Sequence, residues 1–282
     1  MKLLHFSLGL FVSACCLTGC GDKVAGGMST VPTDSLEYSS EGDSVLHCSL
    51  KVDFPTSQDS FSLAVADFVA NELQSLYLPI YIGENHTDPV LKYTGSVTDG
   101  RAMVDFYGKA NYAWLQKEAA EFKESTGAGA VGMECSIALR KIEDNPKYVS
   151  YQTTTYMYLG GAHGSSSIEV ANILKPSGKR LTQTIDTLKL KEMQPMLRKG
   201  VLAYINANSD SSITDSSLND YLLIEGNLIP LPATLPYLAA DGLHFVYQQY
   251  EIAPYAMGII TFTVPYAEAK SFMTAEAKAL VE

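Results

Sequence analysis

The sequence YVSYQTTTYMYLGGAHGSSSIEVANIL, residues 148–174, decides the fold because it reads as two strands joined by a tight loop. β-Branched and aromatic residues alternate in its first half, which suits a pleated, half-buried surface. Three glycines within residues 160–164 allow backbone angles that side chains forbid. We therefore predict a β-hairpin that presents His163 on a compact turn.

Regular patterns flank this hairpin on both sides. Residues 45–54 and 133–145 alternate apolar and polar side chains, as expected of strands with one buried face. Residues 60–77 repeat apolar side chains at helical spacing. Further elements are predicted as helices at residues 110–125, 185–206 and 265–280 and as strands at residues 242–252 and 258–264. Strands and helices in this order predict an α+β fold.

Composition defines the broad class of the protein. Of its 282 residues, 46% are hydrophobic and 18% are charged, which indicates an ordered globular chain. The formal charge of −11 argues against a nucleic-acid partner, because phosphate binding needs a basic face. An acidic surface favours a basic partner, although the same charge also serves simply to keep a protein soluble.

The N-terminus resembles the signal of a bacterial lipoprotein. Lys2 precedes a mostly apolar run too short to span a membrane, and the motif LTGC follows at residues 17–20. The motif is similar to a lipobox, which implies cleavage before Cys20 and acylation of its thiol. The alternative is an ordinary secretory peptide cut elsewhere. We expect a signal peptide at residues 1–19, a flexible tether at residues 20–44 and a lipid-anchored protein of the bacterial cell envelope, outside the cytoplasm.

Two cysteines, Cys48 and Cys135, remain in the body of the expected mature protein. Both occupy apolar positions of alternating runs, so we predict that they lie on neighbouring strands. An exported compartment permits a disulfide between them. The alternative is a pair of buried thiols that pack as small hydrophobic side chains.

Signatures of catalysis are few. No histidine has a second metal ligand at a suitable spacing, and neither a nucleophile elbow nor a phosphate loop is found, so we expect no metal and no cofactor. Glu251 has the chemistry of a general acid or base, but a lone carboxylate at a strand end is usually a surface group. A histidine such as His163 is more often bonded to its loop backbone than catalytic, unless a base orients it.

Two motifs together resemble a known family. YLGGAHG at residues 158–164 is similar to the Gly-Gly-Ala-His hairpin of the extracellular domain in RsiV-like anti-sigma factors, and YQQYEIAPYAMG at residues 247–258 is similar to its closing motif. That domain also occurs beside the catalytic domain of a PdaC-type peptidoglycan deacetylase. The resemblance implies two lobes, each a mainly antiparallel sheet with packed helices: a PdaC-like lobe at residues 45–146 and an RsiV-like domain at residues 147–282.

The resemblance also implies a function. In the anti-sigma factor this region binds lysozyme, so we expect an envelope-anchored binding module, more a binder than an enzyme. Its expected ligand is a wall component, such as an envelope glycan, or a basic secreted protein such as lysozyme. The alternatives are a hydrolase of envelope polysaccharide or peptidoglycan that uses His163 and Glu251, and structural packing within an envelope complex. The expected ligand-binding residues are Gly161, His163, Tyr250, Glu251 and Tyr255.

These residues lie in two sharp breaks of otherwise regular strand pairs, residues 160–164 and 250–258. We predict that the two segments come together in the folded protein. Tyr250 and Tyr255 then offer flat apolar faces that suit either sugar stacking or a protein hot spot. The competing interpretation is that the two segments only brace each other, with their polar groups bonded to buried backbone.

Overall fold

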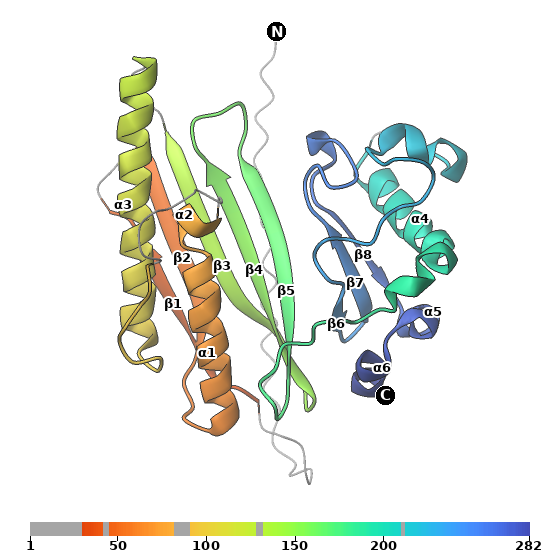
Figure 1. Cartoon of the computed structure of the whole chain (residues 1–282), viewed down its shortest axis with the longest axis horizontal. Coiled ribbons are helices and arrows are strands. Elements are labelled where there is room, and N and C mark those ends of the chain that lie inside the picture. The colour runs from red at the N-terminus through yellow and green to blue at the C-terminus, as the bar shows by residue number, and fades with distance from the viewer. Residues whose placement is uncertain (1–29, 42–44, 82–90, 128–131, 210–211) are drawn as a thin grey trace.

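The computed structural model describes residues 30–41, 45–81, 91–127, 132–209 and 212–282. The expected signal peptide and the lipidation residue Cys20 lie outside the described residues. Within the described part, the chain forms two lobes side by side, each with its own sheet and its own apolar core (Figure 1). This confirms the predicted α+β fold of two lobes with mainly antiparallel sheets.

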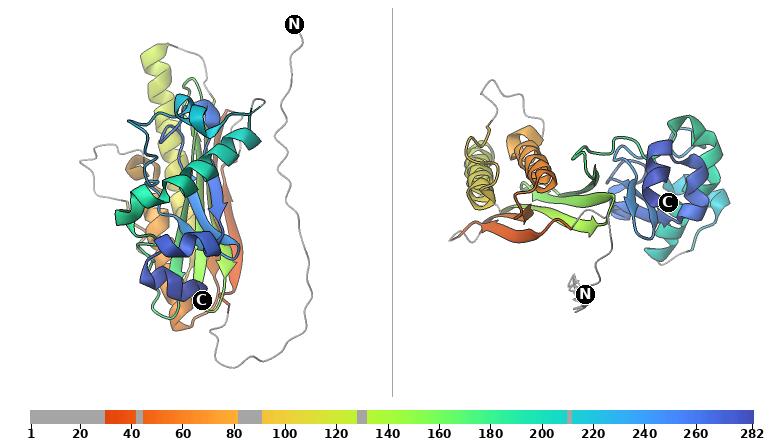
Figure 2. Two further views of the ribbon diagram at one scale, coloured as in Figure 1. Left: turned by 90° about the vertical axis from the view of Figure 1, so that its right-hand side faces the viewer. Right: turned by 90° about the horizontal axis from the view of Figure 1, so that it is seen from below.

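The N-terminal lobe is a five-stranded sheet, here called the large sheet, with helices on one face (Figure 2). Its strands in spatial order are β1 (Thr33–Ser39), β2 (Leu46–Pro55), β3 (Met133–Asp144), β4 (Tyr148–Tyr158) and β5 (Ser165–Leu174). All neighbours are antiparallel except β2 and β3, which are parallel. A parallel pair needs a crossover connection, and α1 (Ser60–Ser75), α2 (Leu78–Tyr81) and α3 (Gly100–Thr126) provide it.

Capping and burial explain where these helices begin. The Asp59 carboxylate accepts hydrogen bonds from two backbone N–H groups of the first turn of α1, which starts where the sequence predicts. In contrast, α3 begins ten residues before the predicted start at residue 110, because Asp99 caps it and Tyr107 is buried in its early turns. Gly108 does not break the helix. It lets the Tyr38 ring pack against α3, since a Cβ there would lie 2.2 Å from a ring carbon.

The C-terminal lobe packs helices around a three-stranded antiparallel sheet, made of β6 (Tyr237–Ala239), β7 (Gly242–Tyr247) and β8 (Ile260–Val264). The helical segments are η1 (Thr187–Lys189), α4 (Leu190–Ala207), η2 (Asp215–Tyr221), η3 (Tyr255–Met257), α5 (Tyr266–Ala269), η4 (Lys270–Phe272) and α6 (Ala275–Val281). The single helix predicted from residue 265 is therefore divided, because Met273 leaves helical geometry to bridge Ile185.

Two predicted boundaries are wrong. The tether expected at residues 20–44 contains β1, which pairs along its length with β2 and packs Leu36 and Tyr38 against the core. The hairpin of β4 and β5 belongs to the large sheet, because β4 pairs with β3, so the predicted lobe boundary at residue 146 falls inside one sheet. The connection between the sheets of the two lobes instead follows β5.

The two cysteines lie where the alternation predicts, but they are not bonded. Cys48 and Cys135 are directly paired in the register of β2 and β3, and both are buried. Both are free thiols in this structure, which corresponds to the second of the two alternatives that the sequence leaves open. The Cys48 thiol lies near the carbonyl oxygen of Gly108, with 3.9 Å between sulfur and oxygen, and packs as a small hydrophobic group.

Buried polar contacts hold the second lobe against the edge strand β5. The Asn172 side chain donates to the carbonyl oxygen of Leu238 at 3.0 Å and accepts from its N–H at 2.9 Å. Nearby, the Glu143 carboxylate accepts from the backbone N–H of Ala240 at 2.9 Å. Such directional bonds fix the relative placement of the two sheets, and with it the geometry of the lobe junction.

Candidate functional site

The loop between β4 and β5 and the turn between β7 and β8 meet at one end of the lobe junction, toward the top of Figure 1. The His163 ring stacks on Tyr255 with centroids 3.9 Å apart and an interplanar angle of 23°. The Tyr255 hydroxyl donates to the carbonyl oxygen of Gly164 at 2.8 Å, and the Tyr250 hydroxyl lies 3.3 Å from His163 Nε2. These contacts confirm the prediction that the two segments come together.

Tyr250 is held in an unusual backbone conformation. It is the one non-glycine residue of the described chain with a positive φ, 66°. A bulky residue adopts this left-handed conformation only at a cost, which the surrounding contacts must offset. The residue is also 55% exposed, so part of its ring is accessible to a partner. Backbone strain at an exposed aromatic residue is typical of a surface that contacts a partner.

Glu251 is a structural carboxylate of the same turn. One of its oxygens accepts from the N–H of Gln248 at 2.7 Å and the other from the N–H of Ala233 at 2.6 Å. Burial, and then the Glu251 charge, raise the pKa of Tyr247, whose hydroxyl donates to the carbonyl oxygen of Pro230. Glu251 therefore braces the turn, and no hydrogen bond or ion pair joins it to His163 in the described part of the chain.

Two amide side chains clamp the turn to the edge of the large sheet. Gln248 accepts from the N–H of Ile168 at 3.1 Å and donates to its carbonyl oxygen at 2.7 Å. Gln249 accepts from the N–H of Ser166 at 2.9 Å. These amides take the place of a further strand beside β5 and satisfy an otherwise open edge. Sequence reasoning missed both residues, although the adjacent glutamines of the YQQYE motif were a visible signal.

A fourth aromatic ring lies next to this contact. Gly164 is buried, and a Cβ there would lie 2.5 Å from the ring of Tyr156, which is itself exposed. We call Tyr156, His163, Tyr250 and Tyr255 the aromatic cluster. Gly161, in contrast, is exposed at the loop tip with open space around it, so its predicted part in binding stays a prediction.

Most polar atoms of the aromatic cluster already have hydrogen-bond partners. The Nδ1 atom of His163 lies 3.0 Å from the carbonyl oxygen of Gly164, and its Nε2 atom faces the Tyr250 hydroxyl. Among the described residues no carboxylate contacts His163, and the side-chain neighbour of its Nε2 atom is the Tyr250 hydroxyl. What the cluster offers to a partner is a set of apolar ring faces.

Exposed apolar side chains also occur on the C-terminal lobe. Tyr221, Leu223 and Leu228 are all exposed. The N–H of Leu223 donates to the carbonyl oxygen of Ile252 at 2.8 Å, which places this segment beside the turn that carries Tyr250. Leu223 thus adds an exposed aliphatic side chain beside this turn, and aromatic and aliphatic groups side by side are common at protein–protein contacts.

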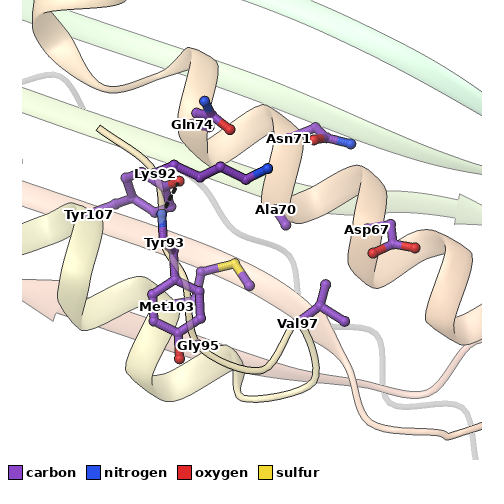
Figure 3. Close-up of a pocket in the computed structure, with 10 residues that line it drawn as sticks. All are labelled: Asp67, Ala70, Asn71, Gln74, Lys92, Tyr93, Gly95, Val97, Met103 and Tyr107. Atoms are coloured by element: carbon purple, nitrogen blue, oxygen red, sulfur yellow. Dashed lines mark hydrogen bonds between the residues drawn. The ribbon is translucent and has the colours of Figure 1, made fainter. Parts of the chain in front are cut away.

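A separate cavity of about 400 Å³ lies in the N-terminal lobe, between α1, α3 and residues 92–97 (Figure 3). Lys92 extends over α1 toward Asn71, and the hydroxyl of Tyr107 accepts from the N–H of Tyr93 at 3.2 Å. This cavity shares no lining residue with the aromatic cluster. Among the described residues, no group of three or more histidine, cysteine or acidic side chains suits a metal, and no helix is long and apolar enough to cross a membrane.

Comparison with known proteins shows the fold. A family model described as "Protein of unknown function (DUF3298)" matches residues 173–267, most of the C-terminal lobe. A solved DUF3298 family member from Bacteroides fragilis NCTC 9343 is 19% identical, with a TM-score of 0.60 over 91% of this chain and 99% of that chain. Another, from Pseudomonas aeruginosa PAO1, is 15% identical, with a TM-score of 0.55 over 88% of this chain and 96% of that chain. No curated protein matches the sequence.

Proposed function

We propose that this protein is a lipid-anchored module of the bacterial cell envelope that binds a basic secreted protein of the lysozyme class. The observation that carries the proposal is the exposed Tyr250 ring, held at a positive φ beside the stacked pair of His163 and Tyr255. A rigid aromatic group on a braced turn is the kind of residue that dominates protein–protein affinity. The resemblance to RsiV-like extracellular domains supports the same assignment.

The chemistry of the surface favours a protein over a wall glycan. Sugar recognition needs free hydrogen-bonding groups around a stacking ring, but the hydroxyl of Tyr255 and the ring nitrogens of His163 already have partners. The exposed apolar side chain of Leu223, beside the turn that carries Tyr250, suits a protein contact instead. The formal charge of −11 favours association with a basic partner and repels an acidic one.

Lipid anchoring through Cys20 would place this surface on the outside of a membrane. The Cys20→Ala variant is expected to lose labelling by a radioactive fatty acid and to leave the membrane fraction, because the acylated thiol is removed. Undiminished labelling of this variant would contradict the anchoring, without bearing on the binding surface.

The binding proposal is tested by titrating the full-length protein with chicken lysozyme in a calorimeter. Saturable binding is expected, and it should weaken as salt rises, because the partners carry opposite charge. An acidic protein of similar size, such as α-lactalbumin, is the matched probe and should not bind. No heat of binding with lysozyme, or equal binding of both probes, would contradict the proposal.

A further inference from the structure

A second pocket, of about 380 Å³, lies between α1 and the β4–β5 hairpin. We call it the hydroxyl pocket. It is lined by Glu72, Ser75 and Leu76 of α1, by Thr153 and Thr155 of β4, and by Ser167 and Glu169 of β5. Its volume falls in the range of small-molecule sites, roughly 300–1,000 Å³. None of its residues belongs to the aromatic cluster.

The core face of β4 changes character at this pocket. Val149 and Tyr151 on this face are buried in the apolar core, whereas Thr153 and Thr155 continue the same face with hydroxyl groups. The register places Glu169 opposite Thr153 on β5. The face therefore turns from apolar to polar at the place where it lines the pocket.

Thr153 provides an independent sign of a ligand. The residue is only 6% exposed, yet its hydroxyl makes no hydrogen bond to any described residue, although it lines the pocket. The neighbouring hydroxyls of Thr155 and Ser167 do pair, at 2.8 Å. The hydroxyl is therefore open to the pocket, where water or a polar group of a ligand can pair with it.

Two carboxylates give the pocket its charge. The Glu72 side chain is 20% exposed. Its pKa lies above the ordinary value, chiefly because of burial; the Arg180 charge opposes this shift and the Glu169 charge adds to it. The nearest guanidinium nitrogen of Arg180 lies 3.6 Å from a Glu72 oxygen, beyond good hydrogen-bond distance. Two acids and one base leave an excess negative charge, which a cationic group in the pocket would neutralise.

We propose that the hydroxyl pocket binds a small hydroxylated primary amine of the amino-sugar class. Its ammonium group lies between the carboxylates of Glu72 and Glu169, which accept charge-assisted hydrogen bonds. Its hydroxyl groups pair with Thr153 and with the other hydroxyls of the lining. This site goes beyond the proposed docking of a protein at the aromatic cluster and is independent of it.

The test is calorimetric titration of the full-length protein with glucosamine. The uncharged N-acetylglucosamine retains the ring hydroxyls and is the matched probe. Glucosamine should bind saturably, and N-acetylglucosamine should bind more weakly by on the order of tenfold or more, because it lacks the ammonium group. Absence of glucosamine binding, or equal affinity for both sugars, overturns the proposal.

Paired variants locate the site. Glu169→Gln should weaken glucosamine binding by on the order of tenfold, and Thr153→Val should weaken it without lowering Tm, because the Thr153 hydroxyl has no protein partner to lose. The controls are Glu192→Gln, on an exposed position of α4, and Thr154→Val, whose hydroxyl accepts from Gln152 outside the pocket. If Thr153→Val fails to fold, the glucosamine affinity of Glu169→Gln still tests the site, because Glu169 is exposed and its substitution should leave the fold intact. Unchanged affinity in Glu169→Gln, or equal losses in the controls, refutes the site, while lysozyme binding is expected to be unaffected throughout.

Discussion

Asn172 is expected to be the most important single side chain for holding the two lobes together. It is 3% exposed, and its amide bonds both the N–H and the carbonyl oxygen of Leu238 as well as the Ser150 hydroxyl. Replacing Asn172 with Ala removes these three hydrogen bonds. It leaves the backbone N–H and carbonyl oxygen of the fully buried Leu238 without the amide that they bond. The substitution probes the lobe junction directly.

The magnitude follows from the groups left unpaired. A buried donor or acceptor without its partner costs about 1–3 kcal/mol, so the two backbone groups of Leu238 together cost about 2–6 kcal/mol. Whole domains are stable by only about 5–15 kcal/mol, so Asn172→Ala should strongly lower the urea midpoint of the full-length protein. The opened junction should also weaken partner binding at the aromatic cluster.

The assay is urea unfolding followed by circular dichroism, with Asn71→Ala as the matched control. Asn71 is exposed, and its variant should change the unfolding free energy by no more than about 0.5 kcal/mol. A loss below about 1 kcal/mol in Asn172→Ala would refute the reasoning, because it would mean that water or backbone movement replaces the amide at little cost.

Three further predictions follow from single residues. Gly242→Ala should lose about 2 kcal/mol in urea unfolding, because φ is +153° and the new Cβ would lie 2.4 Å from the carbonyl oxygen of Val264; a wild-type midpoint would contradict this. Burial raises the pKa of Tyr266 to about 12. The unfolded chain releases this proton near pH 10, so stability should fall as pH rises from about 10 to 12, and Tyr266→Phe should reduce the slope in alkaline unfolding curves. Cys48 and Cys135 should resist iodoacetamide in the folded protein and both react after unfolding without reductant; protection that persists after unfolding would indicate a disulfide.

The elements that sequence patterning predicted well are those whose burial is periodic. The helix α1 has a capping aspartate and an apolar stripe, and β2 alternates strictly, so local residues specify both. β1 was missed because its large apolar residues are only Leu36 and Tyr38, so it becomes a strand only by pairing with β2. The lobe boundary was misplaced for a related reason: which sheet a hairpin joins depends on a distant strand, here β3.

The site was predictable in part. The contact between the two loops was predicted from their residues alone. Both loops concentrate glycines and aromatic residues outside regular strands, and core packing does not explain such residues. The role of Glu251 was not predictable, since it depends on where the N–H of Ala233 lies after folding. The clamp formed by Gln248 likewise requires β5 to be an edge strand, a property that emerges only from the complete sheet.

The most direct measurement of the central claim is the lysozyme affinity and the Tm of Tyr250→Ala, each compared with the wild-type protein. Leu188→Ala, another strongly exposed apolar position, is the control, since Leu188 lies in η1 and outside the aromatic cluster. Loss of a hot-spot ring should weaken binding by roughly thirtyfold, corresponding to about 2 kcal/mol. Tm should stay close to the wild-type value, because the Tyr250 residue is 55% exposed and alanine meets the same cost of the positive φ. Leu188→Ala should bind as the wild type does. A fall in Tm with unchanged affinity would show instead that the aromatic cluster only braces the two lobes.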